Sequence, residues 1–194
     1  MSKISLSDLL SEIRQCKICE PHLALGANPV LRAESSARIL IVGQAPGTRV
    51  HESGIPWNDP SGDRLRQWMG LDKTLFYDAR KIAIVPMGFC YPGKGKSGDL
   101  PPRAECAPRW HEEVLSLLPN IELTLLIGNY AQNYYLDKRY KTLTERVAAW
   151  REYEPDFIPL VHPSPRNTYW LQQNPWFEQE LVPAMQKRLA NLTK

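Results

Sequence analysis

The chain has 194 residues, of which 43% are hydrophobic and 23% charged, and its net charge is only +3. No apolar run approaches the roughly 18–20 residues that a membrane span needs, and the opening residues MSKISLSD lack the apolar segment of a secretion signal. These features exclude a membrane protein and predict a cytoplasmic protein, most simply a monomer. With neither a linker nor a repeat, we expect residues 1–194 to form a single domain.

Helical and strand-like segments alternate along the chain. Helical spacing of apolar residues, a glycine stop or a cap predicts helices over residues 5–15, 63–70, 103–118, 131–143 and 176–189, the last kinked or divided at Pro183. Short apolar runs predict buried strands over 38–42, 81–85, 123–127 and 156–161.

This alternation predicts an α/β fold of three layers, α/β/α, with a central four-stranded parallel sheet covered by helices on both faces. In such sheets, ligands bind outside the carboxyl ends of the strands. Three loops with unusual chemistry leave those ends, at residues 43–59, 88–102 and 162–167. We therefore expect these three loops to meet in one cleft.

The four cysteines form two pairs, Cys16-x2-Cys19 and Cys90 with Cys106. Without a secretion signal, a disulfide framework is not expected. Four thiolates suit either zinc or an iron–sulfur cluster. Buried cysteines with a chance CxxC, or a redox CxxC, are further interpretations of the same spacing.

Several motifs together resemble a known family. They are "GQAPGTRVHESGIPW" at residues 43–57, "LLIGNYAQ" at 125–132, "VHPSPRN" at 161–167, and the cysteine layout. In this order, they are similar to the iron–sulfur (family 4) uracil-DNA glycosylases, over nearly the whole chain. The resemblance implies a hydrolase that flips a deaminated base out of DNA and cleaves its N-glycosidic bond. It also implies a 4Fe-4S cluster held by Cys16, Cys19, Cys90 and Cys106, with zinc as the alternative occupant.

The resemblance assigns roles to individual residues. Trp57 matches the aromatic residue that stacks on the flipped base, although a core tryptophan would be the ordinary interpretation. His162 matches the histidine that donates a hydrogen bond to the departing base, although a lone histidine at a strand end is commonly structural. Gln44 matches a glutamate and can bind a base or water without accepting a proton. The turn residues Gly43, Ala45, Pro46 and Gly47 would shape the base pocket, and Ser164, Arg166, Asn167, Lys94 and Lys96 would contact DNA.

The chain departs from the family pattern at three places. Gln44 replaces the glutamate, and the acidic residue expected further along the loop falls on His51. The neighbouring Glu52 and Asp59 could supply a carboxylate instead, and Asp59 is the candidate catalytic residue. Pro86 stands where relatives have a base-reading asparagine, and Asn58 could read the base instead. These departures leave the preferred base open, with hypoxanthine as one option. A nucleic-acid-binding member without catalysis, and a zinc-stabilised α/β enzyme acting on a small nucleotide, are the alternative hypotheses.

Overall fold

The computed structural model describes residues 4–194. Its strands are β1 Ile39–Val42, β2 Ile82–Ile84, β3 Leu123–Ile127 and β4 Phe157–Leu160. Its helices include α1 Leu6–Arg14, α2 Thr48–Ser53, α3 Pro60–Met69, α4 Lys73–Phe76, α5 Cys106–Ser116, α6 Gly128–Tyr135, α7 Leu143–Ala148, α8 Thr168–Gln173 and α9 Val182–Leu192. Short 3-10 turns occur at Glu20–His22, Trp150–Tyr153 and Pro165–Asn167, and a π-helical turn, Phe177–Leu181, precedes α9.

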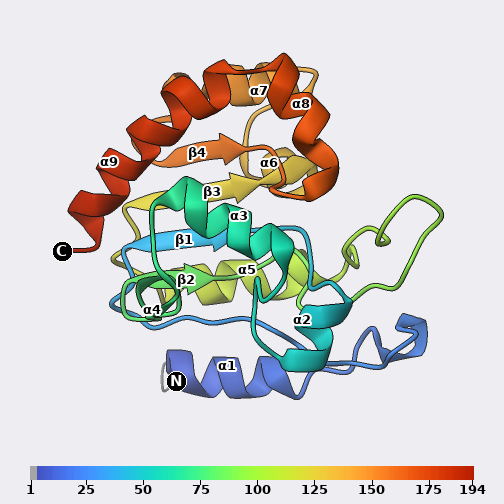
Figure 1. The fold of residues 1–194 in the computed structure, drawn as a ribbon. Helices are drawn as coiled ribbons and strands as arrows, with labels where there is room; N and C mark the ends of the chain where they lie inside the picture. Colours follow the sequence, from blue (N-terminus) through green and yellow to red (C-terminus); the bar gives the residue numbers. More distant parts are fainter. Residues whose placement is uncertain (1–3) are drawn as a thin grey trace.

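The four strands form one parallel sheet in the order β2-β1-β3-β4. Figure 1 shows all four arrows pointing toward the same side of the molecule, where α2 and the long segment between β2 and α5 also lie. The chain goes from β1 to its neighbour on one side and then returns to β3 on the other side. The carboxyl ends of β1 and β3 therefore border the switch point where ligands bind in sheets of this kind.

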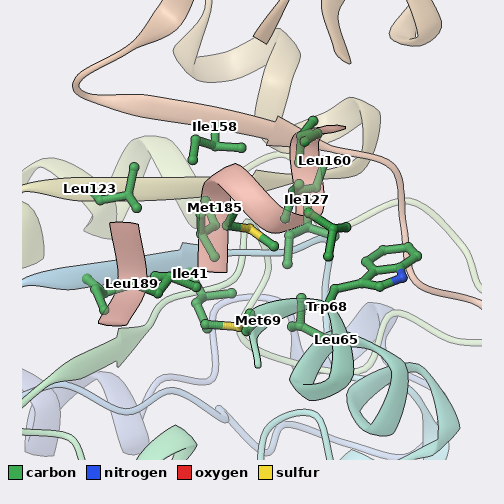
Figure 2. Packing of buried hydrophobic residues seen from close by; sticks show 14 of the residues in the cluster. Ile41, Leu65, Trp68, Met69, Leu123, Ile127, Ile158, Leu160, Met185 and Leu189 are labelled. Atoms are coloured by element: carbon green, nitrogen blue, oxygen red, sulfur yellow. The ribbon is translucent and has the colours of Figure 1, made fainter. Parts of the chain in front are cut away.

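Side chains of each strand alternate between two hydrophobic cores. In β1, Ile39 and Ile41 enter the core beneath α3 and α9, whereas Leu40 and Val42 enter the core beneath α1 and α5. This alternation follows from the two-residue period of a strand. Figure 2 shows the first core, in which strand residues meet Leu65 of α3 and Met185 of α9. Helices therefore cover both faces of the sheet, and the predicted three-layer fold is confirmed.

Several helix boundaries differ from the sequence-based predictions. The helix expected over 131–143 is wrong in its second half, because α6 ends at Tyr135 and residues 136–142 form a non-helical connection. The next helix, α7, begins only at Leu143, after a capping box between Thr142 and Glu145. The loop expected at 43–59 contains α2. Pro183 lies in the first turn of α9, after the π-helical turn, so the last helix is divided as predicted.

Within residues 4–194, no helix combines the length and the apolar character needed to cross a membrane.

Candidate active site

The loops expected to converge do form one cleft, with a volume of about 430 Å³. This volume lies in the range typical of sites for small ligands. The segment after β1 supplies one wall, the segments after β2 and β4 supply the others, and Pro86 forms part of the lining. The predicted residues that line it are Gln44, Ala45, Pro46, Gly47, Trp57, Asp59, His162, Ser164 and Arg166.

Trp57 has a left-handed backbone conformation, with a φ of 57°. This conformation costs a non-glycine residue about 1–3 kcal/mol and persists only where its surroundings enforce it. Arg66, which is 6% exposed, donates to the Trp57 carbonyl oxygen at 3.2 Å and to the Tyr77 hydroxyl oxygen at 3.3 Å. Tyr77 in turn donates to the Pro56 carbonyl oxygen at 2.9 Å. Arg66 and Tyr77 therefore hold the turn that presents the indole.

Two glycines make room for Trp57. A β-carbon on Gly62 would lie 1.8 Å from the Trp57 carbonyl oxygen, and one on Gly43 would lie 2.7 Å from Cζ2 of its indole. Both separations are far below van der Waals contact. Gly43, expected to shape the base pocket, therefore contributes by admitting the indole against the backbone at the end of β1.

The hydrogen bonds of His162 define its tautomer. The backbone N–H of Ser164 donates to Nδ1 of His162 at 3.1 Å, so Nδ1 carries no proton. Burial lowers the pKa of His162, while the charges of Asp59 and Asp99 oppose that shift. The imidazole is therefore neutral near pH 7, with its proton on Nε2. That N–H group can donate to a ligand in the cleft.

The rings of Trp57 and His162 lie side by side, with centroids 5.7 Å apart and planes inclined by 37°. A base sandwiched between two rings needs about 7 Å between them, twice the usual carbon–carbon contact of about 3.5 Å. The pair therefore does not enclose a base between its two faces. A planar ligand can instead stack on the open side of Trp57, with His162 at its edge.

Gln44 and Asp59 both line the cleft, and each already has a hydrogen-bond partner. Gln44 donates its side-chain amide to the Leu100 carbonyl oxygen at 3.3 Å, which connects the β1 wall to the segment after β2. Asp59 is the N-cap of α3, and its Oδ1 accepts from the backbone N–H of Gly62 at 2.8 Å. The Asp59 carboxylate thus holds the start of α3, which explains why this helix begins earlier than predicted.

Three polar residues order the loop after β4, and one of them, Arg166, connects it to the segment after β2. Arg166 donates its guanidinium to the Ser97 carbonyl oxygen at 2.7 Å, and Asn167 donates its amide to the His162 carbonyl oxygen at 2.7 Å. The Ser164 hydroxyl accepts from the backbone N–H of Arg166 at 3.3 Å. These contacts position the loop beside His162 and connect it to the segment after β2.

Of the predicted base- and DNA-binding residues, five lie outside the cleft lining: Gly43, Asn58, Lys94, Lys96 and Asn167. Asn58 is exposed and does not line the cleft, where a base reader was expected. Lys94 and Lys96 are exposed on the segment after β2.

Two residues that matter to the cleft were missed by sequence reasoning. Asp99 lines the cleft from the segment after β2, and Arg66 holds the Trp57 turn from behind. The signal for Asp99 was its place in the Gly-rich loop already expected to reach the cleft. Arg66 gave no such signal, because a charged residue in a helix is usually exposed.

A buried histidine supports the Pro86 part of the lining. His111 of α5, 1% exposed, has its Nε2 2.9 Å from the Pro86 carbonyl oxygen, so Nε2 carries the proton and donates. Its Nδ1 then accepts from the Tyr135 hydroxyl at 2.5 Å. Burial lowers the pKa of His111, which keeps this imidazole neutral.

All four cysteines line a second, smaller cavity, together with Arg103. Burial raises the pKa of Cys90 to about 11 and that of Cys106 to about 12. Burial and then Glu105 raise the pKa of Cys19, while the Arg103 guanidinium opposes that rise. A metal group would therefore have to displace protons from these thiols.

The residues around this cavity suit an anionic group with several thiolate ligands. The side-chain Nε of Arg103 is buried and has no hydrogen-bond partner within residues 4–194. In the same part of the chain, no three Cys, His, Asp or Glu side chains converge on one point as a single metal ion requires. The four thiols thus face a common space without forming a single-ion site.

The sheet and the cleft define a three-layer α/β protein with an aromatic, histidine-bearing ligand site at the topological switch point. Residues 31–186 match the family model described as the uracil DNA glycosylase superfamily, and the chain belongs to that superfamily. The chain is also 24% identical over 169 residues to the type-4 uracil-DNA glycosylase of Sulfurisphaera tokodaii. The aligned region covers 82% of this chain and 74% of that protein. The resemblance expected from the sequence motifs is confirmed.

Proposed function

We propose that this protein is a DNA glycosylase that takes a deaminated base, uracil or a similar one, out of the helix and hydrolyses its N-glycosidic bond. The observation that carries the proposal is the neutral His162, with its Nε2 proton free to donate, beside Trp57 in one cleft. Membership in the uracil DNA glycosylase superfamily supports the same reaction class.

The chemistry fits these two side chains. Flipping a base costs a few kcal/mol in lost stacking and pairing, and stacking on Trp57 recovers part of this cost. As the bond breaks, the base departs with the bonding electron pair and its oxygen gains negative charge. A preorganised donor such as the Nε2–H of His162 binds this charged oxygen more strongly than the neutral oxygen of the ground state. Because the transition state gains more from the hydrogen bond than the ground state does, the barrier is lowered.

The loop after β4 and the segment after β2 would contact the DNA backbone. Arg166 and Ser164 lie at the cleft, Lys94 and Lys96 are exposed beside it, and Tyr169 is 72% exposed on α8. Cationic side chains on phosphates position the duplex, and their contribution weakens with salt.

The direct test incubates the purified protein with duplexes that carry uracil, hypoxanthine or xanthine and measures alkali-labile abasic sites. We expect cleavage of at least one substrate. Trp57→Ala and His162→Ala should each slow cleavage by about 10²–10³-fold, because the first removes the wall on which the base stacks and the second removes a transition-state hydrogen-bond donor. Tyr130→Ala, on an exposed aromatic outside the cleft lining, is the matched control.

Two observations favour a second candidate, a nucleic-acid-binding member without catalysis. The Gln44 amide is bonded to Leu100 and cannot accept a proton, and Pro86 offers no side-chain polar group at the cleft. Salt-dependent duplex binding without cleavage of any of the three bases would support this candidate and contradict the glycosylase.

We also propose that Cys16, Cys19, Cys90 and Cys106 hold a 4Fe-4S cluster. Their shared cavity and the Nε of Arg103, which is unpaired within residues 4–194, support an anionic group at this place, with zinc as the alternative occupant. Such a cluster would tie the N-terminal segment to the segment after β2. Anaerobically purified protein should be brown and contain iron and sulfide, and Cys90→Ala should lose both. A colourless protein with one zinc per chain would contradict the cluster.

A further inference from the structure

Hydrolysis of an N-glycosidic bond requires a group that orients the attacking water and takes its proton. A carboxylate performs this task, whereas a carboxamide cannot accept the proton. Gln44 is therefore excluded from this role. Two carboxylates, Asp59 and Asp99, line the cleft, and the charges of both act on His162.

The two carboxylates differ in the hydrogen-bond partners that they already have. Asp59 caps α3 through Oδ1, so its position is determined by the helix. Asp99 has no salt-bridge partner among the described residues, and its hydrogen-bond contact there is a long one, 3.5 Å from the Tyr91 hydroxyl. The residue is also exposed to solvent, so water reaches it.

Neighbouring contacts hold Asp99 at the cleft although it belongs to a long loop. Gln44 donates to the carbonyl oxygen of Leu100, the next residue, and Arg166 donates to that of Ser97. Oδ2 of Asp99 lies 3.5 Å from the point that a β-carbon on Gly47 would occupy. The carboxylate therefore lies beside Gly47 in the turn after β1, near enough to contact a β-carbon at that position.

We infer that Asp99 is a catalytic residue of the proposed reaction, and that its carboxylate orients the attacking water and accepts the water's proton. The C1′–N bond breaks with both electrons going to the base, which His162 stabilises through Nε2–H. The water oxygen forms the new bond to C1′ and its proton passes to Asp99. The departing base takes a proton from solvent, and Asp99 returns its proton to solvent. The inference rests on the proposed glycosylase function.

The test is single-turnover cleavage of a uracil-containing duplex by Asp99→Asn, which preserves the shape and polarity of the side chain. We expect the rate at saturating enzyme to fall by about 10²–10⁴-fold, the usual contribution of a general base, with unchanged duplex affinity and melting temperature. In Asp99→Ala, added formate should restore part of the rate in proportion to its concentration. Ser97→Ala, on the same loop with its backbone acceptor intact, is the matched control.

The outcomes separate the two proposals. If the unaltered protein cleaves the duplex and Asp99→Asn cleaves it within threefold of that rate, the assignment of Asp99 is wrong and the glycosylase stands. A loss that appears only as weaker binding, or only with one of several cleaved bases, also overturns the water role. If the unaltered protein cleaves no substrate, the glycosylase proposal fails, and the assignment of Asp99 fails with it.

Discussion

The indole of Trp57 lies against Gly43 so closely that a β-carbon at residue 43 would come within 2.7 Å of Cζ2. Gly43 directly follows β1, so the end of a buried strand sets the position of the indole. The same indole has His162 at its side. This relationship makes Gly43 a determinant of the cleft although it has no side chain.

Gly43→Ala should therefore move the indole without unfolding the protein. The ring is partly buried and can turn away, so we expect the melting temperature to stay within a few degrees of that of the unaltered protein. Cleavage should fall by about 100-fold, because a displacement of about 1 Å at a reactive site has that cost. Rates measured alongside Trp57→Ala check the prediction, and the double variant should be no slower than Trp57→Ala alone. Additive losses would show that Gly43 acts independently of Trp57.

Gly62→Ala should have a different outcome, because its neighbour is backbone. The new β-carbon would lie 1.8 Å from the Trp57 carbonyl oxygen, and the turn cannot move without losing the Arg66 contact. We expect a loss of more than about 3 kcal/mol in the free energy of unfolding, at the upper end for point substitutions. Gln67→Ala, exposed on the same helix, should stay within about 0.5 kcal/mol. Chemical denaturation measures both, and equal effects would contradict the clash.

Tyr77→Phe tests whether the polar support behind Trp57 contributes to stability. The substitution removes the hydrogen bond to the Pro56 carbonyl oxygen and one acceptor of the buried Arg66 guanidinium. The expected loss in the free energy of unfolding is about 1–3 kcal/mol, the cost of leaving a buried polar group unpaired. Urea denaturation provides the value. If Tyr77→Phe left the free energy of unfolding unchanged, the left-handed turn would need no such support.

Asp59 and Asp72 form a matched pair for separating a helix cap from a charge in the cleft. Each caps a helix through one carboxylate oxygen at 2.8 Å, Asp59 on α3 and Asp72 on α4, but only Asp59 lines the cleft. Asp59→Ala and Asp72→Ala should each lose about 1 kcal/mol in unfolding free energy. Asp59→Asn should retain the cap and its stability, so any change in its cleavage rate reports the charge. If Asp72→Ala slowed cleavage as much as Asp59→Ala, the slower cleavage would result from reduced stability alone and not from the charge in the cleft.

His111, which is buried, and His162, which is half-buried, predict a pH dependence of stability. Burial lowers the pKa of His162 and of His111, so the folded state binds fewer protons than the unfolded chain between these lowered values and the ordinary value of about 6.5. The free energy of unfolding should therefore increase with pH through that window and be smallest on its acid side. Denaturation curves from about pH 5 to about pH 8 measure this slope.

The control for this pH dependence uses substitutions of histidine. Replacing His111 and His162 together by glutamine should flatten the slope, whereas the exposed His22→Gln should retain it. A double variant with the original slope would assign the effect to other groups.

Much of the candidate site was predictable because it depends on local sequence. Strands that end in Gly- and Pro-rich loops indicated where the cleft lies, and the sheet order confirms that these loops meet. The helix expected over 131–143 was wrong because aromatic and apolar residues continue past the true end of α6 at Tyr135, and the capping box at Thr142 was not recognised. Asn58 was expected in the cleft from its place beside Trp57, but it is exposed and does not line the cleft.

The sequence by itself determined the layers of the fold and the kinds of side chain at the cleft, because apolar periodicity and turn residues act over short distances. Only the tertiary structure decided how those side chains are engaged. It paired Gln44 with Leu100 and Asp59 with the start of α3, and within residues 4–194 it gave Asp99 only a long hydrogen bond to Tyr91. These outcomes depend on which distant segments pack together, and a hydrogen bond between residues 56 positions apart has no signature in local sequence.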